Sequence, residues 1–225
     1  MNPILNNVAS YMQYDTNEMT SYGKKDFSKI INKLVDDVVY DSDATPIKKI
    51  YDKLDIKLVE LDLESYKNNG NILGYIIAKN ENFEIEPGES TVVAGVNKND
   101  GPRRKNFTKA HELYHAIYDL SEKMKESPRA KYVHSVRIES AEKRTVKGEN
   151  RRDAKARKEN EKKANEFAAQ LLMPADKLSA AYQVTKSIKE LAQRFDVSHK
   201  NMKERLRNLG LRKPLIFRLV GWGRA

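Results

Sequence analysis

The 225-residue sequence contains no cysteine and only four histidines. Without cysteine the chain forms neither a disulfide nor a thiolate metal site, so any metal ion must be held by His, Asp or Glu. The opening run MNPILNNVASYMQYDTNEM lacks the basic start and apolar stretch of a signal peptide. No later run approaches the roughly 18 apolar residues that span a membrane. We therefore expect a soluble, cytoplasmic protein without a membrane partner.

Positive charge is scarce in the first half of the chain. Residues 1–120 carry a net charge of −4, whereas residues 121–163 carry +7 and residues 184–225 carry +8. Such asymmetry indicates an acidic protein partner or nucleic acid, although a merely soluble surface gives the same pattern.

The segment FTKAHELYHA contains the pattern His-Glu-x-x-His at His111, Glu112 and His115. A chain of this composition would contain roughly 0.006 copies by chance. Two histidines four residues apart leave the same face of a helix, close enough to hold one metal ion. Zinc held by two imidazoles and a third protein ligand keeps a position open for water, and a neighbouring carboxylate moves the protons. The pattern predicts a Zn²⁺-dependent peptidase with Glu112 as its catalytic carboxylate.

Hydrophobic periodicity and turn signals predict an α+β chain. The three strands expected before the histidine pair should form a small antiparallel sheet packed by helices. In order, the expected elements are helices over 24–40 and 47–54, strands over 56–61, 72–78 and 91–97, a helix through Leu120 with Thr108 as its N-cap, a strand or short hairpin within 131–138, and a long helix from about 149 to Met173.

The long helix should supply the third metal ligand. Glu161 and Asn165 lie four residues apart and share a helix face, so Glu161 can complete the metal site. Asn165 can accept a hydrogen bond from the outer nitrogen of a ligand histidine. Glu159 and Glu166 are the alternatives for the third ligand, and spacing alone leaves the choice open.

Two runs together, FTKAHELYHAIY and the segment ExxANEFAAQLLMP at residues 161–174, resemble the ImmA/IrrE family of zinc metallopeptidases. The resemblance implies a zincin-like domain of three antiparallel strands packed by helices, followed by a C-terminal helical part. It also implies that His111, His115 and Glu161 are the zinc ligands. Two features depart from the family: Tyr114 stands where many members have Gly, and the basic segment at residues 121–160 is longer than expected.

The chain is therefore expected to divide at residue 183. Residues 1–183 would form the zincin-like metallopeptidase domain, with 121–160 as a basic insertion, and residues 184–225 a helix-turn-helix-like region. In this second region Ser198 is the expected N-cap of the second helix.

The spacing of these C-terminal helices resembles a DNA-binding helix-turn-helix, in which Lys200, Asn201, Lys203 and Arg207 would face bases or phosphates. In the ImmA/IrrE family a similar element is usual, and can serve mainly to build the domain and shape the substrate surface.

A tetrahedral intermediate also needs a donor for its oxyanion. His134 and Tyr118 are the candidates, with Tyr114 and Tyr132 as rivals, and each is equally compatible with packing or surface roles.

The leading hypothesis is a zinc endopeptidase that cleaves a regulatory protein, which the resemblance implies is a helix-turn-helix repressor of a mobile element or stress response. Two alternatives stay open. One is a DNA-binding regulator with a structural or vestigial metal site, and the other is a toxin–antitoxin component held inactive by a partner.

Overall fold

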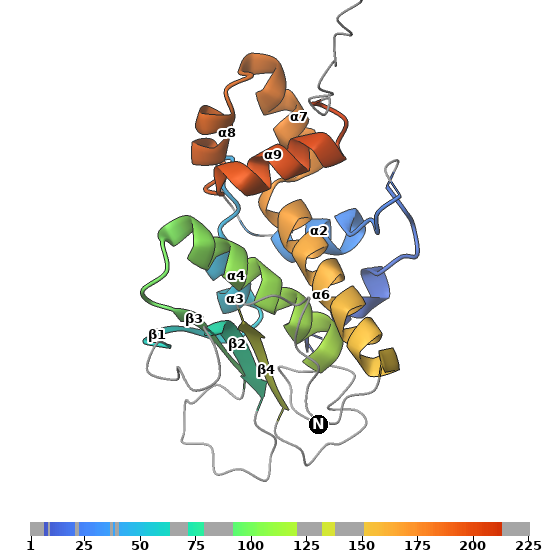
Figure 1. Ribbon diagram of the computed structural model, residues 1–225, viewed down its shortest axis with the longest axis vertical. Coiled ribbons are helices and arrows are strands. Elements are labelled where there is room, and N and C mark those ends of the chain that lie inside the picture. The colour runs from blue at the N-terminus through green and yellow to red at the C-terminus, as the bar shows by residue number, and fades with distance from the viewer. Residues whose placement is uncertain are drawn as a thin grey trace, which may run out of the picture.

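The computed structural model describes residues 7–8, 10–20, 23–36, 38, 41–63, 72–78, 92–120, 132–137 and 151–212. Within these ranges helices cover one face of a small sheet and continue beyond it (Figure 1). The helices are η1 (Tyr11–Tyr14), α2 (Ser28–Val35), α3 (Ile47–Lys53), α4 (Pro102–His115), the π turn η3 (Ala116–Leu120), α6 (Arg151–Leu172), α7 (Ala175–Val184), α8 (Ile188–Arg194) and α9 (His199–Asn208). The strands are β1 (Lys57–Leu61), β2 (Ile72–Ala78), β3 (Val92–Asn97) and β4 (Tyr132–Arg137).

The expected α+β class is confirmed, but the prediction of a three-stranded antiparallel sheet is wrong in two details. The sheet has a fourth strand, β4, and the strand order is β1-β3-β2-β4. β1 runs parallel to β3, whereas β2 is antiparallel to both β3 and β4. Alternation along a strand reports which face is buried and does not identify the neighbouring strand. The strand bounds were therefore predictable and the pairing was not.

Two glycines let chain segments approach the sheet closely. A Cβ at Gly74 in β2 would lie 2.5 Å from Thr108 Cγ2 and 3.0 Å from Glu112 Oε1, both on α4. A Cβ at Gly95 in β3 would meet the ring of Tyr75, its partner across the ladder, at 2.2 Å. Because no side chain intervenes at Gly74, α4 lies directly against β2.

The helix α4 begins earlier than expected. Its N-cap is Gly101 and Pro102 occupies the first turn, so the expectation that Thr108 caps this helix is wrong. Proline suits the first helical position because its missing N–H has no intrahelical partner there. Thr108 is instead buried within the helix, against β2.

The predicted helix over residues 24–40 begins later in the structure, at Ser28, where a side chain of α6 hydrogen-bonds to the backbone that precedes α2. The Gln170 amide donates to the Lys25 carbonyl (2.7 Å) and accepts from the Phe27 N–H (3.0 Å). The Phe27 ring meets that of Phe167 edge to face, with centroids 5.4 Å apart. These contacts fix α6 against the N-terminal part of the chain.

The C-terminal helices share one hydrophobic core with the rest of the described chain. Phe195 and Leu206 belong to the same cluster of buried side chains as Phe167. The predicted cap is confirmed, since Ser198 Oγ accepts from the Asn201 N–H at 3.1 Å. The boundary at residue 183 stays a prediction, and packing across it is continuous.

Candidate metal centre

The helix α4 brings the predicted pair of histidines together. Nε2 of His111 lies 3.1 Å from Nε2 of His115, and both rings are almost fully buried. From α6, the Glu161 carboxylate faces both rings, at 3.3 Å from His111 Nε2 and 3.8 Å from His115 Nε2. Three potential ligand atoms thus converge from two helices that pack against each other.

The outer nitrogen of each histidine has an oxygen partner. His111 Nδ1 lies 3.0 Å from Asn165 Oδ1, and His115 Nδ1 lies 2.7 Å from Asp119 Oδ2. Because these oxygens accept, they favour the tautomer with the proton on Nδ1, which leaves the lone pair of each Nε2 for a metal ion. Such partners fix the tautomer and the ring orientation of a metal-binding histidine.

Sequence reasoning missed Asp119 and the side chains that hold it. The Asn160 amide donates to both Asp119 oxygens, at 2.9 and 2.8 Å, and accepts from the Tyr114 hydroxyl at 2.9 Å. Asn160 directly precedes Glu161, so this network also ties the end of α4 to the carboxylate on α6. Asp119 lies in the π turn η3, a type of turn that is frequent at functional sites.

The two alternatives for the third ligand lie elsewhere on α6. Glu159 is exposed and pairs with Lys162 at 3.3 Å, whereas Glu166 pairs with Lys24 at 3.4 Å. Among the described residues, the carboxylate that reaches both imidazoles is that of Glu161.

The separations between these donors fit a tetrahedral divalent metal ion. Ligands held about 2.0–2.2 Å from such an ion lie roughly 3.3 Å from one another. The two Nε2 atoms are 3.1 Å apart, and the nearest Glu161 oxygens, Oε2 to His111 and Oε1 to His115, lie at 3.3 and 3.8 Å, which is close to that value. Two imidazole nitrogens and one carboxylate are also a donor set typical of a catalytic site that leaves one position open. The group can therefore hold a metal ion.

Glu112 is fully buried beside the histidines, between α4 and β2. Its Oε1 is the atom that a side chain at Gly74 would crowd. The charge of Glu112 also acts on Tyr51, whose pKa is raised chiefly by burial and further by this carboxylate. Tyr51 stays protonated and donates to the Lys109 carbonyl on α4 at 2.8 Å.

The structure describes the side chain of only one of the two predicted oxyanion donors, Tyr118. Tyr118 stacks on Tyr114 with centroids 4.4 Å apart, and burial together with nearby Asp15 raises the pKa of its hydroxyl. The backbone of His134 lies in β4 opposite Ile76, and its side chain, like that of Tyr132, lies outside the described residues. Both roles stay predictions.

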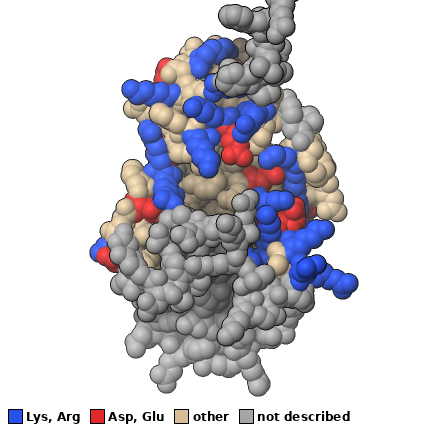
Figure 2. Space-filling view, in the orientation of Figure 1, with Lys and Arg blue, Asp and Glu red and all other residues tan. Residues whose placement is uncertain are grey.

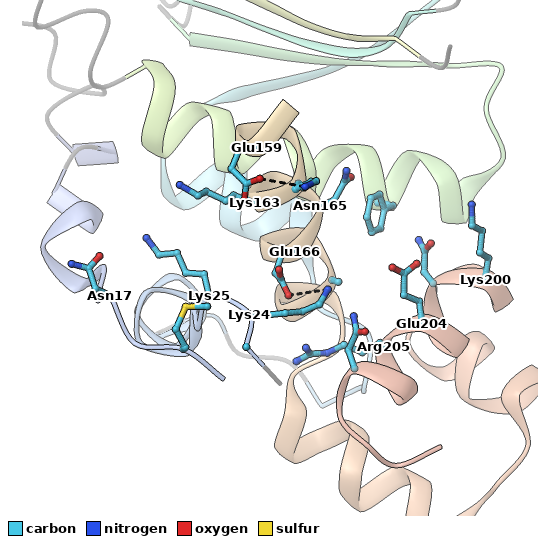
Figure 3. A pocket seen from close by; sticks show the side chains of 17 residues that line it. Asn17, Lys24, Lys25, Glu159, Lys163, Asn165, Glu166, Lys200, Glu204 and Arg205 are labelled. Atoms are coloured by element: carbon cyan, nitrogen blue, oxygen red, sulfur yellow. Dashed lines mark hydrogen bonds and ion pairs between the residues drawn. The ribbon is translucent and has the colours of Figure 1, made fainter. Parts of the chain in front are cut away.

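The four residues predicted to contact DNA divide between two faces of α9. Lys200 and Asn201 line a groove between α9, α6 and the N-terminal segment (Figure 3). Lys203 and Arg207 are exposed away from that groove. In Figure 2, lysine and arginine side chains surround a recess below the C-terminal helices, with acidic side chains among them.

No helix in the described part of the chain has both the length and the apolar character needed to cross a membrane. A search of curated proteins found no match. A solved structure described as a Mycobacterium tuberculosis transcriptional regulator is similar, with 16% sequence identity and a TM-score of 0.47. The match covers 95% of this chain and 54% of that one, so the chain spans about half the length of that protein.

A family model described as the IrrE N-terminal-like domain, of the peptidase M78 family, matches residues 52–207. The match includes the histidine pair on α4, the carboxylate on α6 and the C-terminal helices, and it confirms the zincin-like fold. Because it covers more than half of the sequence, the chain belongs to the IrrE N-terminal-like metallopeptidase family.

Proposed function

We propose that this chain is a zinc-dependent endopeptidase that cleaves a regulatory protein, with a helix-turn-helix transcriptional repressor as its substrate. The observation that carries the proposal is the convergence of His111, His115 and Glu161, with Glu112 buried next to them. Zinc is the metal that matches two imidazoles and one carboxylate in a chain without cysteine.

The chain's own residues have separate roles in peptide hydrolysis. Bound zinc supplies the Lewis acidity that makes a water molecule nucleophilic near neutral pH. Glu112 accepts the proton of that water and returns it to the leaving amine. Asn165 and Asp119 keep both Nε2 atoms directed inward.

The strand β4 supports the choice of an extended polypeptide as substrate. It is the outermost strand on the β2 side of the described sheet, and β2 is the strand that α4 contacts at Gly74. An outer strand presents unpaired backbone groups to which an extended peptide can add as a further strand. A peptide bound along β4 would therefore extend the sheet on the side of β2, the strand that α4 contacts at Gly74.

The substitution Glu112→Gln tests the proposal because it keeps the shape of the side chain and removes the base. Zinc content should stay near one ion per chain, while peptide-bond cleavage should fall by about 10²–10⁴-fold. Cleavage is measured by mass spectrometry on a proteome-derived peptide library and on purified helix-turn-helix repressors. Glu190→Gln is the matched control, since Glu190 on α8 is an exposed carboxylate away from the histidines and outside the groove of Figure 3. Equal cleavage by Glu112→Gln and the wild type would disprove the mechanism.

A further inference from the structure

A groove of about 750 Å³ lies between α6, α9 and the N-terminal residues 17–20 and 23–25, and is called here the α6–α9 groove (Figure 3). Such a volume is typical of pockets that bury a drug-sized molecule. The groove is large enough to hold a few side chains of a protein segment. It is far too small to enclose a nucleic-acid duplex.

The orientation of α9 also argues against DNA as the occupant. Its residues Lys200, Asn201, Glu204 and Asn208 lie at successive turns along one face, and all four line the α6–α9 groove. A helix that reads DNA presents such a face to the major groove, outside the protein. Here the face is turned toward α6.

The charges of the groove favour an acidic occupant. Six lysine or arginine side chains line it, against three glutamates. Three of these cations are already paired, Lys24 with Glu166, Lys25 with Asp15 and Lys162 with Glu159. Burial lowers the pKa of Arg205 only to about 10, so this residue stays charged at neutral pH, and its Nε donates to the Met173 carbonyl.

Two further lysines of the groove, Lys163 on α6 and Lys200 on α9, are exposed and form no ion pair within the part of the chain that the structure describes. In Figure 3 they stand on either side of Asn165. They are the cations available to carboxylates that enter from outside.

The apolar lining distinguishes a polypeptide from a nucleic acid. Met19 is 60% exposed and is one of three large hydrophobic side chains exposed in the described ranges. It lines the groove together with Phe107 and Ala169. Glutamates in the lining would repel a continuous row of phosphates, whereas a polypeptide can place amides and apolar groups against them. Protein chemistry therefore fits this surface better.

The groove adjoins the metal centre through one residue. Asn165 lines it and is exposed there, while its Oδ1 accepts from His111 Nδ1. Phe107, another lining residue, lies one helical turn before His111 on α4. A segment bound in the groove thus reaches the side chain that orients a metal-binding imidazole.

We propose that the α6–α9 groove binds an acidic segment of the protein substrate, whose carboxylates meet Lys163 on one wall and Lys200 on the other. The word substrate rests on the proposed endopeptidase function. The binding itself does not, because it requires no hydrolysis. In this proposal the groove recognises the substrate protein, and the adjacent metal centre hydrolyses a peptide bond of that substrate.

Fluorescence anisotropy of a fluorescein-labelled octaglutamate peptide tests the groove directly, with the full-length Glu112→Gln protein at 0.15 M salt. Lys163→Glu and Lys200→Glu should each weaken binding at least fivefold. The matched controls are Lys158→Glu on α6 and Lys203→Glu on α9, which make the same charge change outside the groove. They should stay within twofold of the parent. All four side chains are exposed, and equal melting temperatures verify that each variant folds.

Three results would overturn the proposal. The first is an absence of peptide binding, and the second is an equal loss in the groove and control variants, which would indicate attraction by net charge alone. The third is displacement of the peptide by a 20-base-pair DNA duplex with the same dependence on Lys163 and Lys200, which would assign the groove to nucleic acid. None of these results bears on cleavage. The proposed function is tested separately, by the cleavage activity of Glu112→Gln.

Discussion

The two sides of α6 hold their polar groups in different ways. On the inner side, Asn160 and Glu161 face α4, and the hydrogen bonds around Asp119 are 2.7–2.9 Å long beside a fully buried His115. On the outer side, the Lys162–Glu159 pair spans 3.3 Å with 63% and 58% of the two side chains exposed. Exposed pairs of this kind contribute about 0–1 kcal/mol and exchange partners readily. The inner side therefore holds its groups in one geometry, as a metal centre requires. The outer side can rearrange its ion pairs to bind a partner.

Asn165 belongs to both sides. Its carbonyl oxygen orients His111, and the same side chain is exposed in the α6–α9 groove. The contrast between a rigid inner side and an adaptable outer side can be tested by substitutions that affect one of them alone.

Of the substitutions that compare the two sides of α6, Asp119→Asn should have the larger effect, because it breaks the inner network. The substitution replaces one carboxylate oxygen with an NH₂ group, so that a donor would face the donating Asn160 amide. It also removes the negative charge that accepts the hydrogen bond from His115 Nδ1. Loss of such a partner typically lowers metal affinity by about 10–100-fold. Zinc affinity is measured by competition with a chromophoric chelator.

The outer-side comparison for this experiment is Glu159→Gln, which should leave zinc affinity within twofold of the wild type. If Asp119→Asn also binds zinc normally, the inner network does not position the ligands, and the contrast between the two sides of α6 fails.

A smaller effect is expected for Gly74→Ala, which tests whether α4 must lie directly on β2. The added Cβ would lie 2.5 Å from Thr108 and 3.0 Å from Glu112. Overpacking of this kind destabilises a fold by about 1–3 kcal/mol, so we expect the melting temperature to fall by several degrees. Cleavage should also fall, because the added methyl group displaces Glu112. Gly101→Ala is the control, since a Cβ there meets nothing within 4 Å. Equal melting temperatures for the two variants would contradict the close approach.

The sequence predicted what local spacing determines. His111 and His115 share a face because they are four residues apart on one helix, and strand bounds followed from alternation to within one or two residues. Asp119 follows His115 by the same four-residue step, so the same reasoning could have found it.

Features that depend on contacts between distant segments were not predictable. Nothing near Asn160 in sequence indicates that it meets Asp119, because that contact depends on how α6 crosses α4. The late start of α2 similarly depends on Gln170, which lies 145 residues from its partner Lys25. Which side of α9 faces the groove depends on where α9 lies relative to α6, so helical periodicity could not reveal it.

The central claim, that two helices hold one metal ion, is tested most directly by the zinc content of Glu161→Gln. The comparison is with the wild type and Glu159→Gln, measured by inductively coupled plasma mass spectrometry after dialysis against a weak chelator. The wild type and Glu159→Gln should each retain about one zinc ion per chain, and Glu161→Gln should retain almost none. Full zinc occupancy in Glu161→Gln would contradict the assignment of this carboxylate as a ligand, and the proposed metal centre with it.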